Sequence, residues 1–131
     1  MRRGFVDSSV LVAIAFEEPG AQDLRSRLAA FDELLASPLL EAELASALAR
    51  EETEANAANA AHLLEPLHFL LPQRRLTAEI ETSVQAGGLR GADLLHIATA
   101  LFAAPKAGLV FLTLDSKQRE VASRLGFEVA P

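Results

Sequence analysis

The sequence contains no cysteine, no tryptophan and no tyrosine, and its seven phenylalanines are its only aromatic residues. The absence of cysteine excludes disulfides, thiolate metal ligands and cysteine nucleophiles, and it is consistent with a reducing cytosol. The scarcity of aromatic side chains leaves little material for a nucleic-acid surface based on base stacking. Any chemistry in this chain therefore has to come from other kinds of side chain.

Long hydrophobic runs are also lacking. The longest, Val10–Phe16, is far too short to span a bilayer. The basic start at residues 1–4 superficially resembles a signal peptide, but Asp7 interrupts the apolar run after it and Glu17 closes it, without a convincing cleavage site. We expect a cytoplasmic protein with no membrane segment and, at 131 residues of which half are hydrophobic, one domain over residues 1–131.

Positive charge is scarce, because 12 Lys and Arg face 18 Asp and Glu and the formal net charge is −6. This balance argues against a protein that binds nucleic acid through a broad basic surface. The excess of acid is concentrated in residues 41–65, whereas the second half of the chain is nearer to neutral. A polyanion is therefore expected to approach by the second half, or to be attracted by a bound cation.

Short apolar runs that alternate with helical patterns predict the fold class. Strands are expected at residues 4–6, 32–36, 68–71, 108–114 and 127–130. Helices are expected at 10–16, 21–31, 38–48, 54–65, 78–86 with Thr77 as the cap, 93–103 and 116–125. Continuous apolar strands separated by helices indicate a parallel sheet covered on both faces, and thus a three-layer α/β/α sandwich. In such folds sites form at the carboxyl ends of strands.

Asp7 and Asp115 directly follow the two clearest strand candidates. Each also precedes a helix, so an ordinary helix cap or turn residue is an equally good interpretation of either one alone. Because Ser8 and Ser9 are themselves good caps, we expect that the carboxylate of Asp7 is not needed for that purpose.

Glu43 is separated from its neighbour Glu41 by helical phase. At 100° per residue Glu43 falls between Leu39 and Ala47, inside the apolar arc of its helix, whereas Glu41 falls just outside the arc. A carboxylate on a core-facing stripe is unfavourable unless it has a partner or a metal. Glu41 is interpreted as a solvated edge residue.

Asp93 lies at the start of a helix that is apolar nearly all round. A first-turn acid is favoured by the helix dipole in any case, but a carboxylate at a buried helix start is better placed as a ligand. His96, one turn on, is interpreted as a hydrogen-bonded packing residue. Together the four acids provide oxygen ligands only, which select Mg²⁺ or Mn²⁺ rather than Zn²⁺. Such ions can polarise a phosphodiester and activate water.

At these residues the sequence resembles the PIN-domain family, particularly the toxin ribonucleases of VapBC toxin–antitoxin pairs. The resemblance is carried by four segments in order: Phe5-Val6-Asp7-Ser8-Ser9-Val10-Leu11, Ser37-Pro38 with Glu43 to Arg50, Gly91 to Ala100, and Leu112-Thr113-Leu114-Asp115. Each segment alone is a weak signal, but the ordered set covers almost the whole chain.

The resemblance implies that Asp7, Glu43, Asp93 and Asp115 bind Mg²⁺ or Mn²⁺ and are catalytic, with Ser9 and Thr113 as supporting hydroxyls. It implies cleavage of RNA by metal-activated water, a homodimer, and inhibition by a small antitoxin protein. For phosphate contacts, Arg90, Lys117 and Arg119 are the candidates, and ordinary solvated surface is an equally good interpretation of each.

Three other kinds of protein are alternatives to a PIN-domain ribonuclease. A phosphatase of the haloacid dehalogenase type requires a second Asp two residues after the first, where this chain has Ser9. A phospho-receiver domain requires an acidic pair before its first helix and a late Lys, and both are absent. The third is a PIN-like fold that serves only as a binding or assembly module. Within the nuclease interpretation, a role unrelated to toxin–antitoxin pairs also stays open. Phosphate-binding glycine loops and nucleophile elbows are missing as well.

Overall fold

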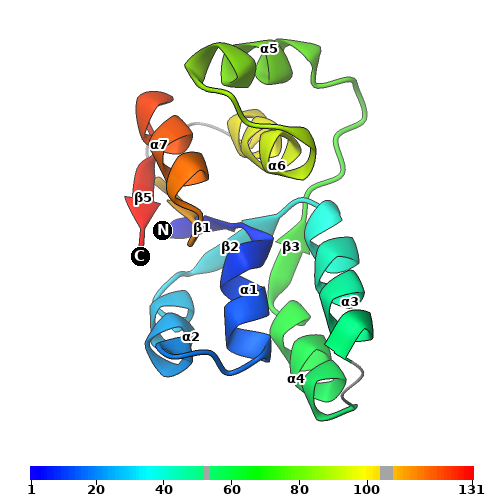
Figure 1. Ribbon diagram of the computed structural model, residues 1–131. Coiled ribbons are helices and arrows are strands. Elements are labelled where there is room, and N and C mark those ends of the chain that lie inside the picture. Colours follow the sequence, from blue (N-terminus) through cyan, green and yellow to red (C-terminus); the bar gives the residue numbers. More distant parts are fainter. Residues whose placement is uncertain (52–53, 104–107) are drawn as a thin grey trace.

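A computed structural model describes residues 1–51, 54–103 and 108–131 of the chain. Its strands are β1 (Arg3–Val6), β2 (Glu33–Ala36), β3 (Leu67–Phe69), β4 (Leu109–Leu112) and β5 (Glu128–Ala130). Its helices are α1 (Ser8–Ala15), α2 (Ala21–Ala29), α3 (Leu39–Glu51), α4 (Glu54–Leu64), α5 (Thr77–Ala86), α6 (Gly91–Phe102) and α7 (Ser116–Arg124) (Figure 1).

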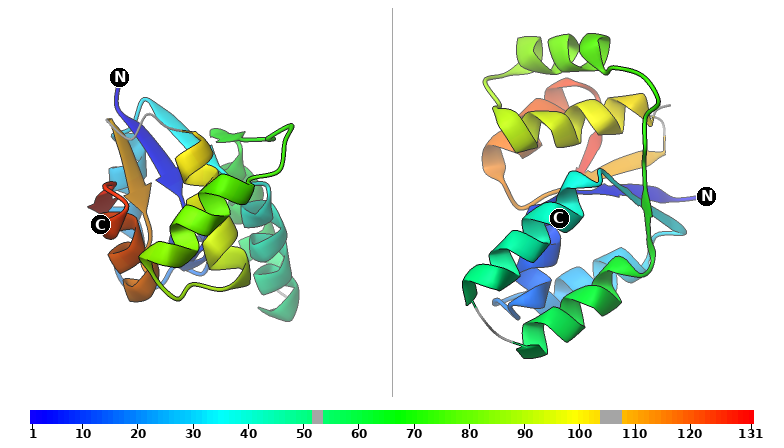
Figure 2. Two further views of the ribbon diagram at one scale, coloured as in Figure 1. Left: turned by 90° about the horizontal axis from the view of Figure 1, so that it is seen from above. Right: turned by 90° about the vertical axis from the view of Figure 1, so that its right-hand side faces the viewer.

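The strands form one parallel sheet in the order β3-β2-β1-β4-β5. Helices α1 to α4 lie on one face of the sheet and α5, α6 and α7 on the other (Figure 1). This arrangement confirms the three-layer α/β/α sandwich. The views in Figure 2 show that the strands run toward the viewer of Figure 1, so the face seen there carries their carboxyl ends. No helix in the described part of the chain is long and apolar enough to cross a membrane.

Alternation along the central strands divides the core in two. On the α5–α7 side, Phe5 stacks on Phe111 with ring centroids 5.7 Å apart, and Phe127 packs against Phe111. On the other side, Val6 and Leu112 pack against α1 and α3. Both central strands are buried on both faces, which explains why they appear in the sequence as unbroken apolar runs.

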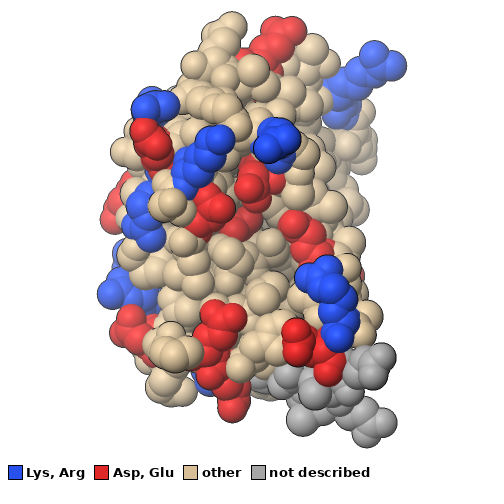
Figure 3. Space-filling view, viewed as in Figure 1, with Lys and Arg blue, Asp and Glu red and all other residues tan. Residues whose placement is uncertain are grey.

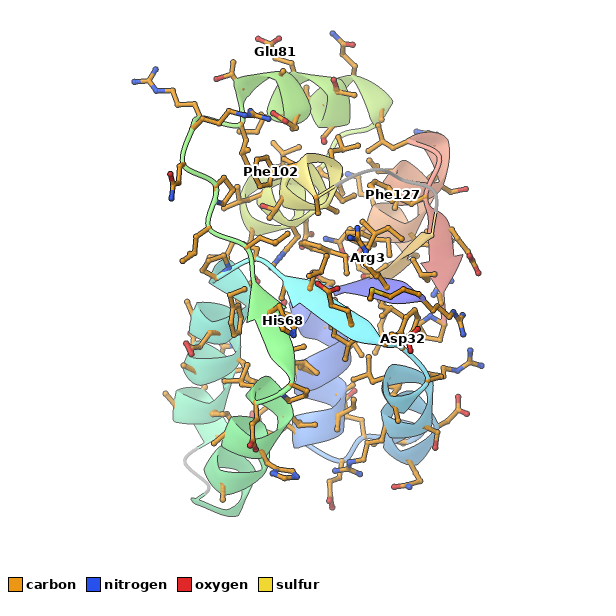
Figure 4. The ribbon with its side chains drawn as sticks, turned by 180° about the vertical axis from the view of Figure 1, so that it is seen from behind. Arg3, Asp32, His68, Glu81, Phe102 and Phe127 are labelled. Atoms are coloured by element: carbon orange, nitrogen blue, oxygen red, sulfur yellow. The ribbon has the colours of Figure 1, made fainter. Side chains whose placement is uncertain are left out.

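Figure 4 shows the molecule from behind, where the amino ends of the strands lie. Here the backbone N–H of Arg2 donates to Asp32 Oδ2 at 2.6 Å, and the Arg2 guanidinium lies 4.6 Å from the Phe31 ring centroid. The labelled side chains Arg3, Asp32 and His68 lie on this side (Figure 4). Asp7 and Asp115 lie at the opposite, carboxyl ends of the strands.

Several predicted boundaries were wrong by one to three residues. The strand predicted to reach Leu114 ends at Leu112, because the hydroxyl of Thr113 turns into the molecule and Leu114 is exposed. The helix predicted to begin at Asp93 begins at Gly91. Thr77 is the first residue of α5 and not its cap, since the cap position is held by the buried Leu76.

Candidate active site

Two adjacent strands bring the first and last acids of the set to one place. Val6 of β1 pairs with Leu112 of β4, and the backbone N–H of Asp7 donates to the carbonyl of Leu112 at 2.9 Å. Asp7 therefore follows β1 immediately, and Asp115 follows β4 by three residues. In Figure 3 acidic side chains gather in the middle of this face, with Lys and Arg side chains around them.

Asp7 is the most buried of the four acids, with 2% of its surface exposed. Its Oδ2 accepts the backbone N–H of Ser9 at 3.1 Å, so Asp7 is itself the cap of α1. The expectation that Ser8 or Ser9 relieves it of this role was wrong, because both serines lie inside the helix. Capping and ligation are compatible here, since the second oxygen, Oδ1, points to other partners.

Thr113 lies directly against this carboxylate. Its Oγ1 is 3.2 Å from Asp7 Oδ2 and 2.7 Å from the side-chain carbonyl of Gln118. Ser9 Oγ lies 3.4 Å from the same Thr113 oxygen and accepts the backbone N–H of Leu114 at 3.0 Å. Thr113 thus contacts Asp7 directly, whereas the Ser9 hydroxyl reaches it through Thr113.

Asp115 caps α7, because its Oδ1 accepts the backbone N–H of Gln118 at 2.8 Å. The helix-cap interpretation of this residue is therefore confirmed, whereas its role as a ligand stays a prediction. Its backbone N–H donates to Thr113 Oγ1 at 3.1 Å, which ties the turn after β4 to the same hydroxyl.

Glu43 extends from α3 to meet His96 of α6, with Oε1 and Nε2 2.5 Å apart. His96 is fully buried, and its Nε2 also lies 3.7 Å from Asp7 Oδ1. The expectation of a hydrogen-bonded, buried His96 is confirmed, but sequence reasoning missed that its partner is Glu43. The carboxylate on the core-facing stripe is thus partnered, while Glu41 is exposed as expected.

Asp93 shows most clearly that the four acids share one neighbourhood. Burial raises the pKa of its carboxyl above the ordinary value, and the charges of Asp7, Asp115 and Glu43 raise it further, while His96 acts in the opposite direction. Like charges disfavour ionisation only when they are near. The structure therefore brings the other three predicted acids within electrostatic reach of Asp93.

Gln118 is a member of the site that sequence reasoning missed. It is fully buried, and its side-chain N–H groups are directed to Asp7 Oδ1 and to the backbone carbonyl of Asp93, each at 3.3 Å. A signal did exist: Asp115 and Gln118 have the spacing of a capping box, in which the third residue normally reaches back to the cap. Here that spacing marks a residue whose side chain goes elsewhere.

The donor set fits a hard cation in its chemistry, because carboxylate oxygens predominate and their mutual repulsion is relieved by positive charge. As the side chains stand, no three His, Asp or Glu residues among those described are grouped so that they could hold one metal ion. Metal binding therefore requires these side chains to draw together.

The candidate phosphate contacts differ from one another. Arg90 and Lys117 are exposed, Arg90 at the N-terminal cap of α6. Arg119 is half-buried and donates to the backbone carbonyl of Thr113 at 3.1 Å, so part of its role is structural. On α3, Arg50 and Glu43 line one open pocket of about 280 Å³ together with Ala42 and Ser46.

Comparison with known families agrees with this geometry. The PIN domain family matches residues 4–124 of the chain, a range that contains all four acids and Gln118. PIN domains are generally nucleases, and theirs is a nuclease-type fold. Among curated proteins, no sequence matches this chain.

Proposed function

The chain belongs to the PIN-domain family, and from this premise we propose that it is a metal-dependent ribonuclease that hydrolyses RNA phosphodiester bonds. Asp7, Glu43, Asp93 and Asp115 are the proposed metal ligands, for one or two Mg²⁺ or Mn²⁺ ions. The observation that carries the proposal is the approach of Asp7, Glu43 and Asp115 to Asp93, whose carboxyl has a pKa raised by burial and by their charges, and whose backbone shares the Gln118 amide with Asp7. A cluster that raises the pKa of its own member is suited to bind a cation.

Each residue has a distinct task in this proposal. Asp7, buried and bonded at both oxygens, is the fixed ligand. Asp93 and Asp115 stand at the starts of two helices, and Glu43 reaches across from α3. When bound, the cation polarises the phosphodiester, promotes deprotonation of water and neutralises charge on the leaving oxygen. The imidazole of His96 holds the carboxylate of Glu43 in place through their hydrogen bond.

The acidity of the protein is compatible with an RNA substrate under this proposal. A net charge of −6 repels a polyanion at long range. A cation held by Asp7, Glu43, Asp93 and Asp115 would supply positive charge that attracts the phosphate. Arg50 lines a pocket with Glu43, Arg90 caps the helix that begins beside Asp93, and Lys117 lies two residues after Asp115, so all three are candidates to contact flanking phosphates.

We further propose that the protein is the toxin of a VapBC-type toxin–antitoxin pair, a cytoplasmic homodimer inhibited by a small antitoxin. The support is the resemblance of the four ordered segments to those toxins. An adjacent reading frame that encodes a small DNA-binding protein, and co-purification of its product with this chain, would support the assignment. Full cleavage activity in the presence of that product would contradict it.

Removal of divalent metal tests the proposed activity directly. Purified protein is expected to cleave single-stranded or structured RNA in Mg²⁺ or Mn²⁺, to lose cleavage in excess chelator, and to regain it when the ion is restored. Gel analysis of end-labelled RNA measures this. Cleavage that persists undiminished in chelator would exclude the metal site, and absence of cleavage with every RNA tested would exclude the ribonuclease.

Glu43 and Glu41 form a matched pair for testing the ligand set. Glu43→Gln removes a charge from the cluster and should lower kcat by on the order of 100-fold. Glu41→Gln makes the same chemical change on the exposed face of the same helix and should leave kcat unchanged. Single-turnover cleavage with both variants measures the difference. Equal cleavage rates for the two variants would show that Glu43 is not a ligand of the site.

A further inference from the structure

We infer that Gln118 is a positioning residue, which fixes the carboxylate of Asp7 in the orientation that metal binding needs. The inference rests on the proposed metal-dependent nuclease. Gln118 lies in the first turn of α7 and is fully buried, although glutamine is among the residues most often exposed. A buried polar side chain of this length requires partners for both its oxygen and its nitrogen.

The partners of Gln118 determine how its amide is oriented. The two groups near Nε2 are Asp7 Oδ1 and the carbonyl of Asp93, each at 3.3 Å, and both can only accept. The group near Oε1 is the hydroxyl of Thr113, at 2.7 Å. The NH₂ group must therefore face the two acceptors, and the amide cannot be reversed without losing both bonds.

Thr113 reinforces this orientation. Its hydroxyl has one proton and lies nearer to Gln118 Oε1, at 2.7 Å, than to Asp7 Oδ2, at 3.2 Å. The shorter contact favours donation to Gln118. The same hydroxyl accepts the backbone N–H of Asp115 at 3.1 Å. Because that N–H is already satisfied, Gln118 is released from the capping role that its spacing from Asp115 predicts, and its side chain is free to reach Asp7.

Asp7 depends on this contact more than the other acids do. Its Oδ2 is held by the backbone of Ser9 within its own helix, but the side-chain donor bonded to Oδ1 comes from Gln118, 111 residues away. A carboxylate held at one oxygen can still turn about its terminal bond, whereas one held at both cannot. Gln118 also connects the first turn of α6 to that of α7 through the carbonyl of Asp93, so it links three of the four acids.

Binding of Mn²⁺ alone tests the inference without relying on catalysis. Gln118→Met keeps the length of the side chain and removes its hydrogen-bonding groups. We expect its dissociation constant for Mn²⁺, measured by calorimetry or electron paramagnetic resonance, to rise by about 10–100-fold, the usual effect of removing a residue that orients a ligand. Gln85→Met, the same substitution at an exposed position of α5, should leave the constant unchanged.

Kinetics separate positioning from a general loss of structure. At low Mn²⁺ the Gln118→Met variant should show a reduced kcat with an unchanged KM for RNA, and saturating Mn²⁺ should restore most of the loss. A protein that is merely less stable responds to temperature and not to metal concentration. The far-ultraviolet circular dichroism and the thermal midpoint are recorded for every variant.

A second pair of variants decides the matter if Gln118→Met does not fold. Thr113→Val removes the hydroxyl that orients the amide and should weaken Mn²⁺ binding, whereas Thr113→Ser keeps the hydroxyl and should bind as the wild type does. In a folded double variant, the effects of Gln118→Met and Thr113→Val should be less than additive, because both act through Asp7.

The outcomes for the two proposals are distinguishable. The first outcome is that the wild type binds Mn²⁺ and the Gln118→Met and Thr113→Val variants bind it equally well. This result would overturn the role of Gln118 but would not contradict the proposed nuclease. Wild-type protein that binds no Mn²⁺ would overturn both.

Discussion

Asp7→Asn is expected to reduce RNA cleavage by on the order of 1,000-fold. Asparagine keeps the shape of the side chain and can still accept the Ser9 N–H that caps α1. The substitution removes the negative charge of the ligand that the structure holds most firmly. It also places an amide beside Gln118 Nε2, which is already a donor.

The measurement is cleavage of end-labelled RNA at saturating Mg²⁺, with circular dichroism to establish that the variant is folded. Asp32→Asn, at the exposed amino edge of the sheet, is the matched control and should retain full cleavage. A folded Asp7→Asn variant that cuts as fast as the wild type would place the site elsewhere.

Asp93→Asn is expected to abolish cleavage and, at the same time, to raise the thermal midpoint of the metal-free protein by a few degrees. The reason is the raised pKa of Asp93: burial and the neighbouring carboxylates make its ionised form unfavourable in the folded state. Asparagine cannot ionise and escapes this penalty. Loss of function together with gain of stability is the signature of a residue kept for its charge.

The pH dependence of that gain follows from the direction of the shift. In the unfolded chain the carboxyl ionises near its ordinary value of 3.8, and in the folded protein only at higher pH. Below both values Asp93 is protonated in either state, and the variant gains little. As the pH rises through the interval between them, the wild type loses stability relative to the variant, and the difference then levels off.

Differential scanning calorimetry from about pH 3 to pH 7 in chelator covers both sides of the ordinary value and measures this difference. Addition of Mg²⁺ provides the complementary measurement. The ion should raise the midpoint of the wild type more than that of Asp93→Asn, because it binds the ionised cluster. A variant that is less stable than the wild type across the whole range would show that Asp93 is a structural residue.

The sequence was sufficient to predict the parts of the fold that depend on continuous burial. The segments Phe5-Val6 and Leu109–Leu112 are buried on both faces, so they are unbroken apolar runs, and the acids after them mark the ends of the strands. Helical phase correctly separated the half-buried Glu43 from the exposed Glu41. Short-range patterns of this kind survive folding because neighbours in sequence remain neighbours in space.

The supporting contacts could not be predicted in the same way. The amide of Gln118 meets Asp7 across 111 residues and His96 meets Glu43 across 53, and no local pattern records such pairings. Local rules are only half right here: the spacing of Asp115 and Gln118 predicts a capping box, of which the Asp115 contact forms and the return contact from the Gln118 side chain does not. The same applies to Thr77, a good cap by type that yields to the buried Leu76.

The pairing of β1 with β4 has a consequence for the timing of activity. Asp7 precedes Asp115 by 108 residues in the chain and Gln118 by 111 residues, so it is synthesised before both. During synthesis at roughly 5–20 residues per second, Asp7 is therefore made several seconds before Gln118. Under the proposed function, a nascent chain in which α7 has not yet folded against β1 has no complete site, so nuclease activity begins only after Gln118 has reached Asp7.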